Sequence, residues 1–192
     1  MRKGDLCNMR YHNITKDDML NGDGLRVVLW LSGCNHYCEG CHNPVTWDPN
    51  GGLLFDEAAK QEIFEQLDKS YISGITFSGG DPFHPANRTD VRDLMMEINR
   101  KYPNKTIWFY TGNVWEDIWD CSMMTCIDIL VDGEFQIQNK DNKLMWKGSS
   151  NQRVIDVKKT LAQDNPKVPI LYCGDYASIK NAGIFAKCSC NM

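Results

Sequence analysis

Short apolar runs alternate along this chain with longer segments whose apolar residues recur at helical spacing. The apolar runs are residues 25–32, 74–78, 106–110, 128–131 and 168–173, and the helical segments are residues 55–69, 89–101, 114–119 and 157–163. This alternation predicts an α/β fold built from βα units around a parallel sheet. A closed eight-fold barrel usually needs about 250 residues. A chain of 192 residues therefore predicts an open sheet or a partial (open) βα barrel with flanking helices.

Glycine and polar residues directly follow the first four of these runs. The segments are Gly33-Cys34, Ser78-Gly79-Gly80-Asp81, Tyr110-Thr111-Gly112 and Asp132-Gly133. Parallel sheets and barrels bind their ligands where the strands end. We therefore expect an active site at this edge of the sheet.

The nine cysteines are an odd number, so they cannot all pair within one molecule. No apolar segment forms a signal-peptide core or approaches the roughly 18 residues of a membrane span. We expect a cytoplasmic protein, in which thiols stay reduced and clustered cysteines act mainly as metal ligands or redox groups. The formal net charge of −4 argues against a nucleic-acid partner held by basic charge and against a polybasic membrane anchor.

Cys34, Cys38 and Cys41 follow the first apolar run at the spacing C-x3-C-x2-C. A loop this short brings three thiolates around one metal centre. Structural zinc usually takes four ligands from paired C-x2-C units, and here His36 or His42 would have to supply the fourth. A cubane iron–sulfur cluster takes four cysteines, so three would leave one iron open for a small molecule. The spacing alone leaves open a cluster, a zinc site and three unrelated buried thiols.

The cysteine motif resembles the signature of the radical S-adenosylmethionine superfamily. Within it, the chain resembles the activating proteins of anaerobic (class III) ribonucleoside-triphosphate reductases. The matching segments are residues 21–26, 32–34, 40–43, 46–47, 78–82, 84–85, 108–112, 130–133 and 146–152. We therefore expect a single domain over residues 1–192, with a core at about 20–152 and a C-terminal extension at 153–192.

The resemblance implies a partial βα barrel in which Cys34, Cys38 and Cys41 hold a [4Fe-4S] cluster. S-adenosylmethionine would chelate the fourth iron, with its ammonium group at the segment 78–81. The resemblance also places Asp132 where related activases hold a monovalent cation. The cofactor-binding residues that we expect are Gly40, Cys41, His42, Ser78, Gly79, Gly80, Asp81, Thr111 and Asp132.

Gly40 departs from much of the superfamily, in which an aromatic residue at this position lies near the adenine. His42 or Tyr37 is therefore expected to contact the adenine instead. Arg26, early in the first apolar run, is expected to pair with an acidic group or to face a partner protein. Residues 148–152 are expected to bind the cofactor or the partner, or to form a simple surface loop.

Aromatic residues on the strands are expected to shield a radical or to pack in the core. They are Trp30, Phe77, Trp108 and Phe109. The other six cysteines are expected to be reduced thiols that hold no second cluster. They are Cys7, Cys121, Cys126, Cys173, Cys188 and Cys190.

The activity that the resemblance implies is reductive cleavage of S-adenosylmethionine to a 5′-deoxyadenosyl radical. The radical would remove a hydrogen atom from a glycine in the C-terminal loop of the large reductase subunit. The electron would come from a flavodoxin- or ferredoxin-type donor. Two alternatives remain: a related enzyme acting on another glycyl-radical enzyme or a small molecule, and an iron–sulfur or zinc module without catalysis.

Overall fold

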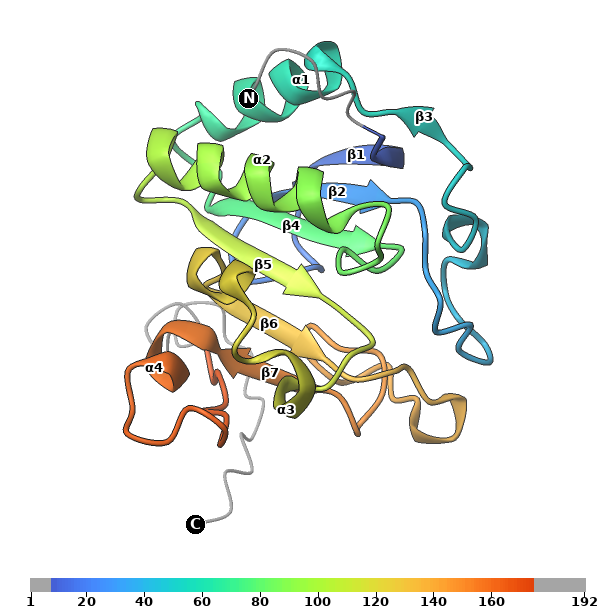
Figure 1. The fold of residues 1–192 in the computed structure, drawn as a ribbon, viewed down its shortest axis with the longest axis vertical. Helices are drawn as coiled ribbons and strands as arrows, with labels where there is room; N and C mark the ends of the chain where they lie inside the picture. Colours follow the sequence, from blue (N-terminus) through green and yellow to red (C-terminus); the bar gives the residue numbers. More distant parts are fainter. Residues whose placement is uncertain (1–7, 175–192) are drawn as a thin grey trace.

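Four of the predicted apolar runs form the centre of a seven-stranded sheet in the computed structural model, which describes residues 8–174 (Figure 1). They are β2 (Arg26–Leu31), β4 (Gly74–Gly79), β5 (Thr106–Tyr110) and β6 (Ile129–Asp132). Neighbours in this series are parallel, and the register pairs Trp30 with Ser78 and Phe77 with Phe109. The prediction of a parallel sheet is confirmed for this central part.

Three outer strands complete the sheet in the order β3-β1-β2-β4-β5-β6-β7. They are β1 (Arg10–Asp18), β3 (Leu53–Leu54) and β7 (Arg153–Asp156). All three pair antiparallel, so the sheet is mixed and not wholly parallel as expected. β1 escapes prediction because it is largely polar, with Ile14 its one buried residue.

The strand expected at residues 168–173 is wrong, because that stretch contributes a single bridge between Leu171 and Ile155. Three of the cysteines whose role the sequence leaves open lie outside the described residues. They are Cys7, Cys188 and Cys190.

Two longer helices, α1 (Glu57–Leu67) and α2 (Arg88–Lys101), lie across one face of the sheet (Figure 1). Asp56 caps α1, because its carboxylate accepts a hydrogen bond of 2.9 Å from the N–H of Ala59. The shorter helices are α3 (Trp115–Ile118) and α4 (Val157–Leu161), with 3-10 turns η1 (Pro44–Thr46), η2 (Ser122–Cys126) and η3 (Ile137–Asn139). None of the helices within residues 8–174 has the length and apolar character needed to cross a bilayer.

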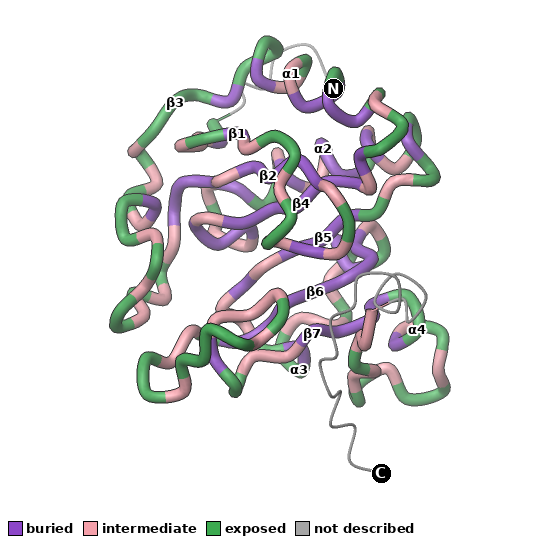
Figure 2. The backbone as a smooth tube through the Cα atoms, turned by 180° about the vertical axis from the view of Figure 1, so that it is seen from behind, coloured by how far each residue is buried: buried purple, intermediate pink, exposed green. Residues whose placement is uncertain are grey.

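The central strands are buried on both sides, as the burial colours of Figure 2 show. Phe77 and Phe109 belong to the large apolar core that includes the inner faces of α1 and α2. Trp108 belongs to a second, smaller cluster, in which its ring packs edge-on against Trp146 and Tyr172 at centroid distances of 5.1 and 5.5 Å. Because side chains alternate along a strand, this smaller cluster occupies the other face of the sheet.

Arg26 lies fully buried on that other face, with its guanidinium 5.4 Å from the centroid of the Trp108 ring. Its hydrogen-bond acceptors are the hydroxyl groups of Thr76 and Thr106 and the carbonyl oxygens of Asp23, Ile75 and Thr106. Burial lowers the pKa of Arg26 to about 10, so it stays charged at neutral pH. Neither expectation for Arg26 holds within residues 8–174, because it ties β2 to β4 and β5 without pairing with an acidic side chain there or facing the surface.

We expect Arg26→Met to lower the free energy of unfolding by about 3 kcal/mol, because several buried acceptors lose their donor at once. The measurement is equilibrium unfolding in urea. The matched control is Arg92→Met on α2, whose half-exposed pair with Asp93 should contribute less than about 0.5 kcal/mol. Equal losses in the two variants would show that the buried network adds little stability.

Candidate functional site

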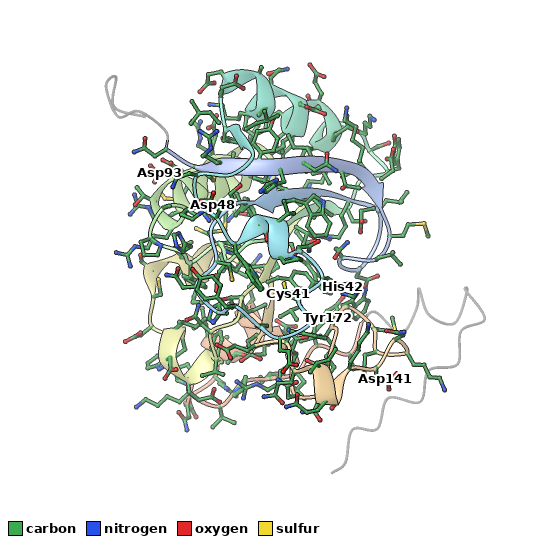
Figure 3. The ribbon with its side chains drawn as sticks, turned by 90° about the vertical axis from the view of Figure 1, so that its right-hand side faces the viewer. Cys41, His42, Asp48, Asp93, Asp141 and Tyr172 are labelled. Atoms are coloured by element: carbon green, nitrogen blue, oxygen red, sulfur yellow. The ribbon has the colours of Figure 1, made fainter. Side chains whose placement is uncertain are left out.

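A cavity of about 530 Å³ opens at the edge where β2, β4 and β5 end. Trp30 and Ser78 line it from the strands, and Cys41 and His42 line it from the cysteine-rich loop. Most of its remaining wall comes from residues 135–152, the loop after β6. Figure 3 views the molecule from this side and shows Cys41 and His42 next to each other near the centre. The volume lies within the range of about 300–1,000 Å³ that is typical of small-molecule sites.

The cysteine-rich loop, residues 33–47, is closed at its base by main-chain hydrogen bonds. The N–H groups of Gly33 and Cys34 donate to the carbonyl oxygens of Thr46 and Trp47 at 2.7 and 3.1 Å. The loop therefore leaves β2 and returns to the same point. All three motif cysteines lie within this loop, and Cys41 lines the cavity.

The three thiols are partly buried and form no disulfide. Burial raises the pKa of Cys34 and of Cys38. At Cys38, a hydrogen bond from the N–H of Phe135 lowers the pKa and offsets part of this rise. The N–H of Asn43 donates to the Sγ atom of Cys41 at 3.4 Å. N–H groups directed at sulfur are typical of iron–sulfur ligation, so this donor set fits a thiolate-bound cluster. Across residues 8–174, no three His, Cys, Asp or Glu side chains converge as ligands of a single metal ion.

His42 and Tyr37, the two expected adenine contacts, lie in different surroundings. His42 lines the cavity, and its ring lies 6.5 Å from the ring of Phe135, which lines the same cavity. Tyr37 is exposed and packs edge-on against Trp47 at 5.3 Å. The geometry favours His42 over Tyr37 as a contact for a ligand in the cavity.

The expected cofactor-binding glycines lie where chain segments approach each other closely. A Cβ atom on Gly80 would lie 2.5 Å from the carbonyl oxygen of Gly33, so a larger residue would push the ends of β2 and β4 apart. Gly40 has a φ of +70° and packs against the side chain of Ile137, which a Cβ atom would approach to 2.8 Å. Gly79, the last residue of β4, adjoins Ser78 at the cavity wall.

Asp81 follows β4 and is buried, with 4% of its surface exposed. Its carboxylate accepts hydrogen bonds from the main-chain N–H groups of Phe83 and Gly112, the Thr111 hydroxyl, the Asn113 amide and the His36 ring. Asp81 and Thr111 are thus bonded to each other beneath the edge. They do not line the cavity themselves, among the residues that the structure describes.

His36, inside the cysteine motif, lies between two carboxylates. Its Nε2 atom lies 2.6 Å from Asp81 and its Nδ1 atom 2.8 Å from Glu134, which follows β6. The hydrogen bond with Asp81, helped by the one with Glu134, raises the pKa of His36 to about 9 although the ring is partly buried. The imidazolium form can donate at both nitrogens, so His36 joins the cysteine-rich loop to the ends of β4 and β6.

Asp132 ends β6 and is almost fully buried, with 1% of its surface exposed. It accepts hydrogen bonds from the N–H of Trp115 at 2.8 Å and from Nε of Arg153 at 3.1 Å. Arg153 also bonds Glu116 at 2.7 and 2.8 Å, and these bonds lower the pKa of Glu116 to about 2. At the position where a monovalent cation is expected beside Asp132, the structure thus has the guanidinium of Arg153.

Comparison with known proteins decides the family. The 4Fe-4S single cluster domain family matches residues 20–155. The anaerobic ribonucleoside-triphosphate reductase-activating protein of enterobacteria phage T4 is 42% identical over 146 residues, covering 76% of this chain and 93% of its own. The protein of the same name from Escherichia coli K12 is 41% identical over 150 residues, covering 76% and 97%. The one from Haemophilus influenzae is 38% identical over 148 residues, covering 75% and 96%. The chain belongs to the anaerobic ribonucleoside-triphosphate reductase-activating protein family.

The four aromatic residues on the strands lie in two different environments. Trp30 lines the cavity, and Trp108 contacts Trp146, which lines it too. Phe77 and Phe109 instead lie in the core on the helix side. Of the four expected aromatics, only those on one face of the sheet therefore lie at the cavity or next to its wall.

Three other cavity residues were not expected in the site. Phe135, from the loop after β6, and Leu20, from the turn before β2, have no signal in the sequence. Trp146 belongs to the matching segment 146–152, but the resemblance gave it no place in the cavity. The expected polar segment contributes Gly148 and Gln152 to the wall, and Gln152 fixes the loop by donating from Nε2 to the carbonyl oxygen of Gly133. Single loop residues of this kind become recognisable only through the fold.

We expect Arg153→Gln to lower the free energy of unfolding at pH 7 by about 3 kcal/mol, because Asp132 is left buried without its cation. The pKa of Glu116 should return from about 2 toward the ordinary value of 4.5. A depressed carboxyl pKa contributes stability above the unfolded pKa, and the contribution is lost as pH falls through the folded pKa. The contribution of the pairing between Glu116 and Arg153 to the free energy of unfolding should be below about 1 kcal/mol, because Glu116 is half exposed.

Urea unfolding at pH 7 and pH 3, with carboxyl titration by NMR, measures both effects. Lys16→Gln, which removes an exposed pair with Glu62, is the control. If Glu116 titrates near 2 in Arg153→Gln as well, its pairing with Arg153 is not the cause of the shift.

Proposed function

We propose that this protein is a radical S-adenosylmethionine activase that generates the glycyl radical of an anaerobic ribonucleoside-triphosphate reductase. The observation that carries the proposal is the three-thiol loop beside a cavity at the ends of parallel strands, in a chain whose relatives bear the name of reductase-activating proteins. The proposal includes an open βα barrel of the radical S-adenosylmethionine type. This barrel forms a single domain, with its core at about residues 20–152 and an extension at residues 153–192.

In this proposal Cys34, Cys38 and Cys41 bind three irons of a [4Fe-4S] cluster. The cavity would hold S-adenosylmethionine, which would coordinate the iron that has no cysteine ligand. When bound, the cluster supplies one electron to the sulfonium, which gives methionine and a 5′-deoxyadenosyl radical that takes a hydrogen atom from a glycine of the reductase. The three-cysteine motif and the match to a single-cluster family support this ligand set.

The chain's own residues bind the cofactor and exclude water. Ser78 and the carbonyl groups of Gly79 and Gly80 are the proposed acceptors for the methionine ammonium group, since Asp81 is already bonded by donors of the chain itself. His42, with Phe135 beside it, is the proposed adenine contact. Trp30, Tyr110 and Trp146 give the cavity an apolar lining, which limits side reactions of a carbon radical.

The proposed partner is the large subunit of the reductase, which presents its C-terminal glycyl-radical loop at the mouth of the cavity. The proposed electron donor is a flavodoxin or ferredoxin. We place the reaction in the cytoplasm, where thiols stay reduced.

We expect Cys34→Ala, Cys38→Ala and Cys41→Ala each to abolish cleavage of S-adenosylmethionine, because each removes a cluster ligand. After anaerobic reconstitution and reduction, 5′-deoxyadenosine is measured by chromatography and cluster iron by chemical analysis. Cys121→Ala, which lies beside the core away from the motif, should keep both. A normal cluster with full activity in Cys38→Ala would disprove the ligand assignment.

Electron paramagnetic resonance on the mixture with the reductase large subunit tests the substrate. A glycyl radical signal is expected there, and none without S-adenosylmethionine. Cleavage without this signal would indicate a different target. A loaded cluster without cleavage would indicate a module that only binds.

We expect His42→Ala and Phe135→Ala each to raise KM for S-adenosylmethionine about tenfold, because contact between a base and an aromatic ring contributes about 1–3 kcal/mol. Tyr37→Ala should leave KM unchanged, since Tyr37 packs against Trp47 outside the cavity. Initial rates of 5′-deoxyadenosine formation give KM and kcat. A larger effect at Tyr37 than at His42 would reverse the assignment.

A further inference from the structure

We propose that His36 is a positioning residue, which holds the cysteine-rich loop against the ends of β4 and β6 so that the cluster and the cofactor cavity keep a fixed relation. The proposal rests on the function proposed above and assigns a task to a residue between two of the motif cysteines. The cysteine spacing alone offers it only as a candidate fourth ligand of a zinc site. The contacts on either side of its ring carry the argument.

The His36 ring is held on three sides by different elements of the edge. Nε2 lies 2.6 Å from the carboxylate of Asp81, and Nδ1 lies 2.8 Å from the carboxylate of Glu134. The ring also covers Gly112, where a Cβ atom would lie 2.5 Å from its Cδ2 atom. One side chain thus joins the cysteine-rich loop to the segments after β4, β5 and β6.

Asp81 links His36 to the segments that follow β4 and β5. Its carboxylate accepts hydrogen bonds from the N–H groups of Phe83 and Gly112 and from the side chains of Thr111 and Asn113. A carboxylate with so many fixed donors has little freedom to move. Because Asp81 lies outside the cavity lining, it acts on the loop through His36.

Glu134 connects His36 to the opposite wall of the cavity. The next residue, Phe135, directs its N–H at Cys38 and its ring at His42. A shift of Glu134 would therefore move a donor to one proposed cluster ligand and a neighbour of the proposed adenine contact. His36 fixes the positions of both carboxylates at once, which requires donors at both of its ring nitrogens.

The test compares His36→Gln, Glu134→Gln and the double variant, each reconstituted anaerobically in the full chain. A glutamine amide cannot bridge two carboxylates in the geometry of an imidazolium. We expect His36→Gln to keep its iron content but to lower the melting temperature, because buried Asp81 loses its cation. The variant should also raise KM for S-adenosylmethionine about tenfold, with kcat changed less than about threefold. The paramagnetic resonance spectrum of the reduced cluster should also respond less to added S-adenosylmethionine.

The double variant tests whether Glu134 acts through His36. Adding Glu134→Gln to His36→Gln should raise KM no further, whereas independent effects would multiply. Hydrogen–deuterium exchange of residues 34–41 before reconstitution gives a readout without cofactor, and it should be faster in His36→Gln. His12→Gln, on the outer strand β1, is the matched histidine control and should match the parent in every measurement.

Two outcomes would overturn the proposal. Parental KM, spectrum and exchange in His36→Gln would show that the bridge positions nothing. Loss of iron, or exchange that is faster throughout the chain and not mainly at residues 34–41, would show a general structural role. Absence of cleavage by the parent protein would instead refute the proposed function. In that case the exchange measurement still decides whether His36 orders the loop.

Discussion

The buried carboxylate of Asp81 is the interaction on which the candidate site depends. A buried charge is costly unless it is paired and hydrogen-bonded, and Asp81 meets this condition by collecting donors from three segments. Phe83 belongs to the segment after β4, the donors at residues 111–113 follow β5, and His36 comes from the cysteine-rich loop. The carboxylate therefore holds together two strand ends and the loop that carries the thiols.

The centre of the fold was predictable because strands buried on both faces have continuous apolar sequences. β2, β4, β5 and β6 all meet this condition. β1 does not, since only Ile14 of its nine residues is buried. β7 has four residues and pairs antiparallel with β6, and the run at 168–173 is apolar without becoming a strand. At the borders of a sheet, tertiary contacts decide what a short segment becomes.

The residues that line the cavity were predictable where they lie on or next to a strand end. Ser78, Cys41 and His42 meet because the carboxyl ends of parallel strands share one edge. Phe135 and Trp146 come from a loop whose path depends on distant hydrogen bonds, such as the one from Tyr110 to the carbonyl oxygen of Trp146. No periodicity marks such residues, so their place in the site follows only from the assembled chain.

Two cations of the chain organise the charges at this edge in the same way. His36 bridges buried Asp81 to exposed Glu134, and Arg153 bridges buried Asp132 to half-exposed Glu116. Each bridge joins two negative groups and one positive group, so each retains one net negative charge.

Asp132 therefore has its own cation, and its burial needs no further ion to offset it. The remaining negative charge of the two bridges lies close to the cysteine-rich loop. It favours a ligand that brings positive charge to this edge.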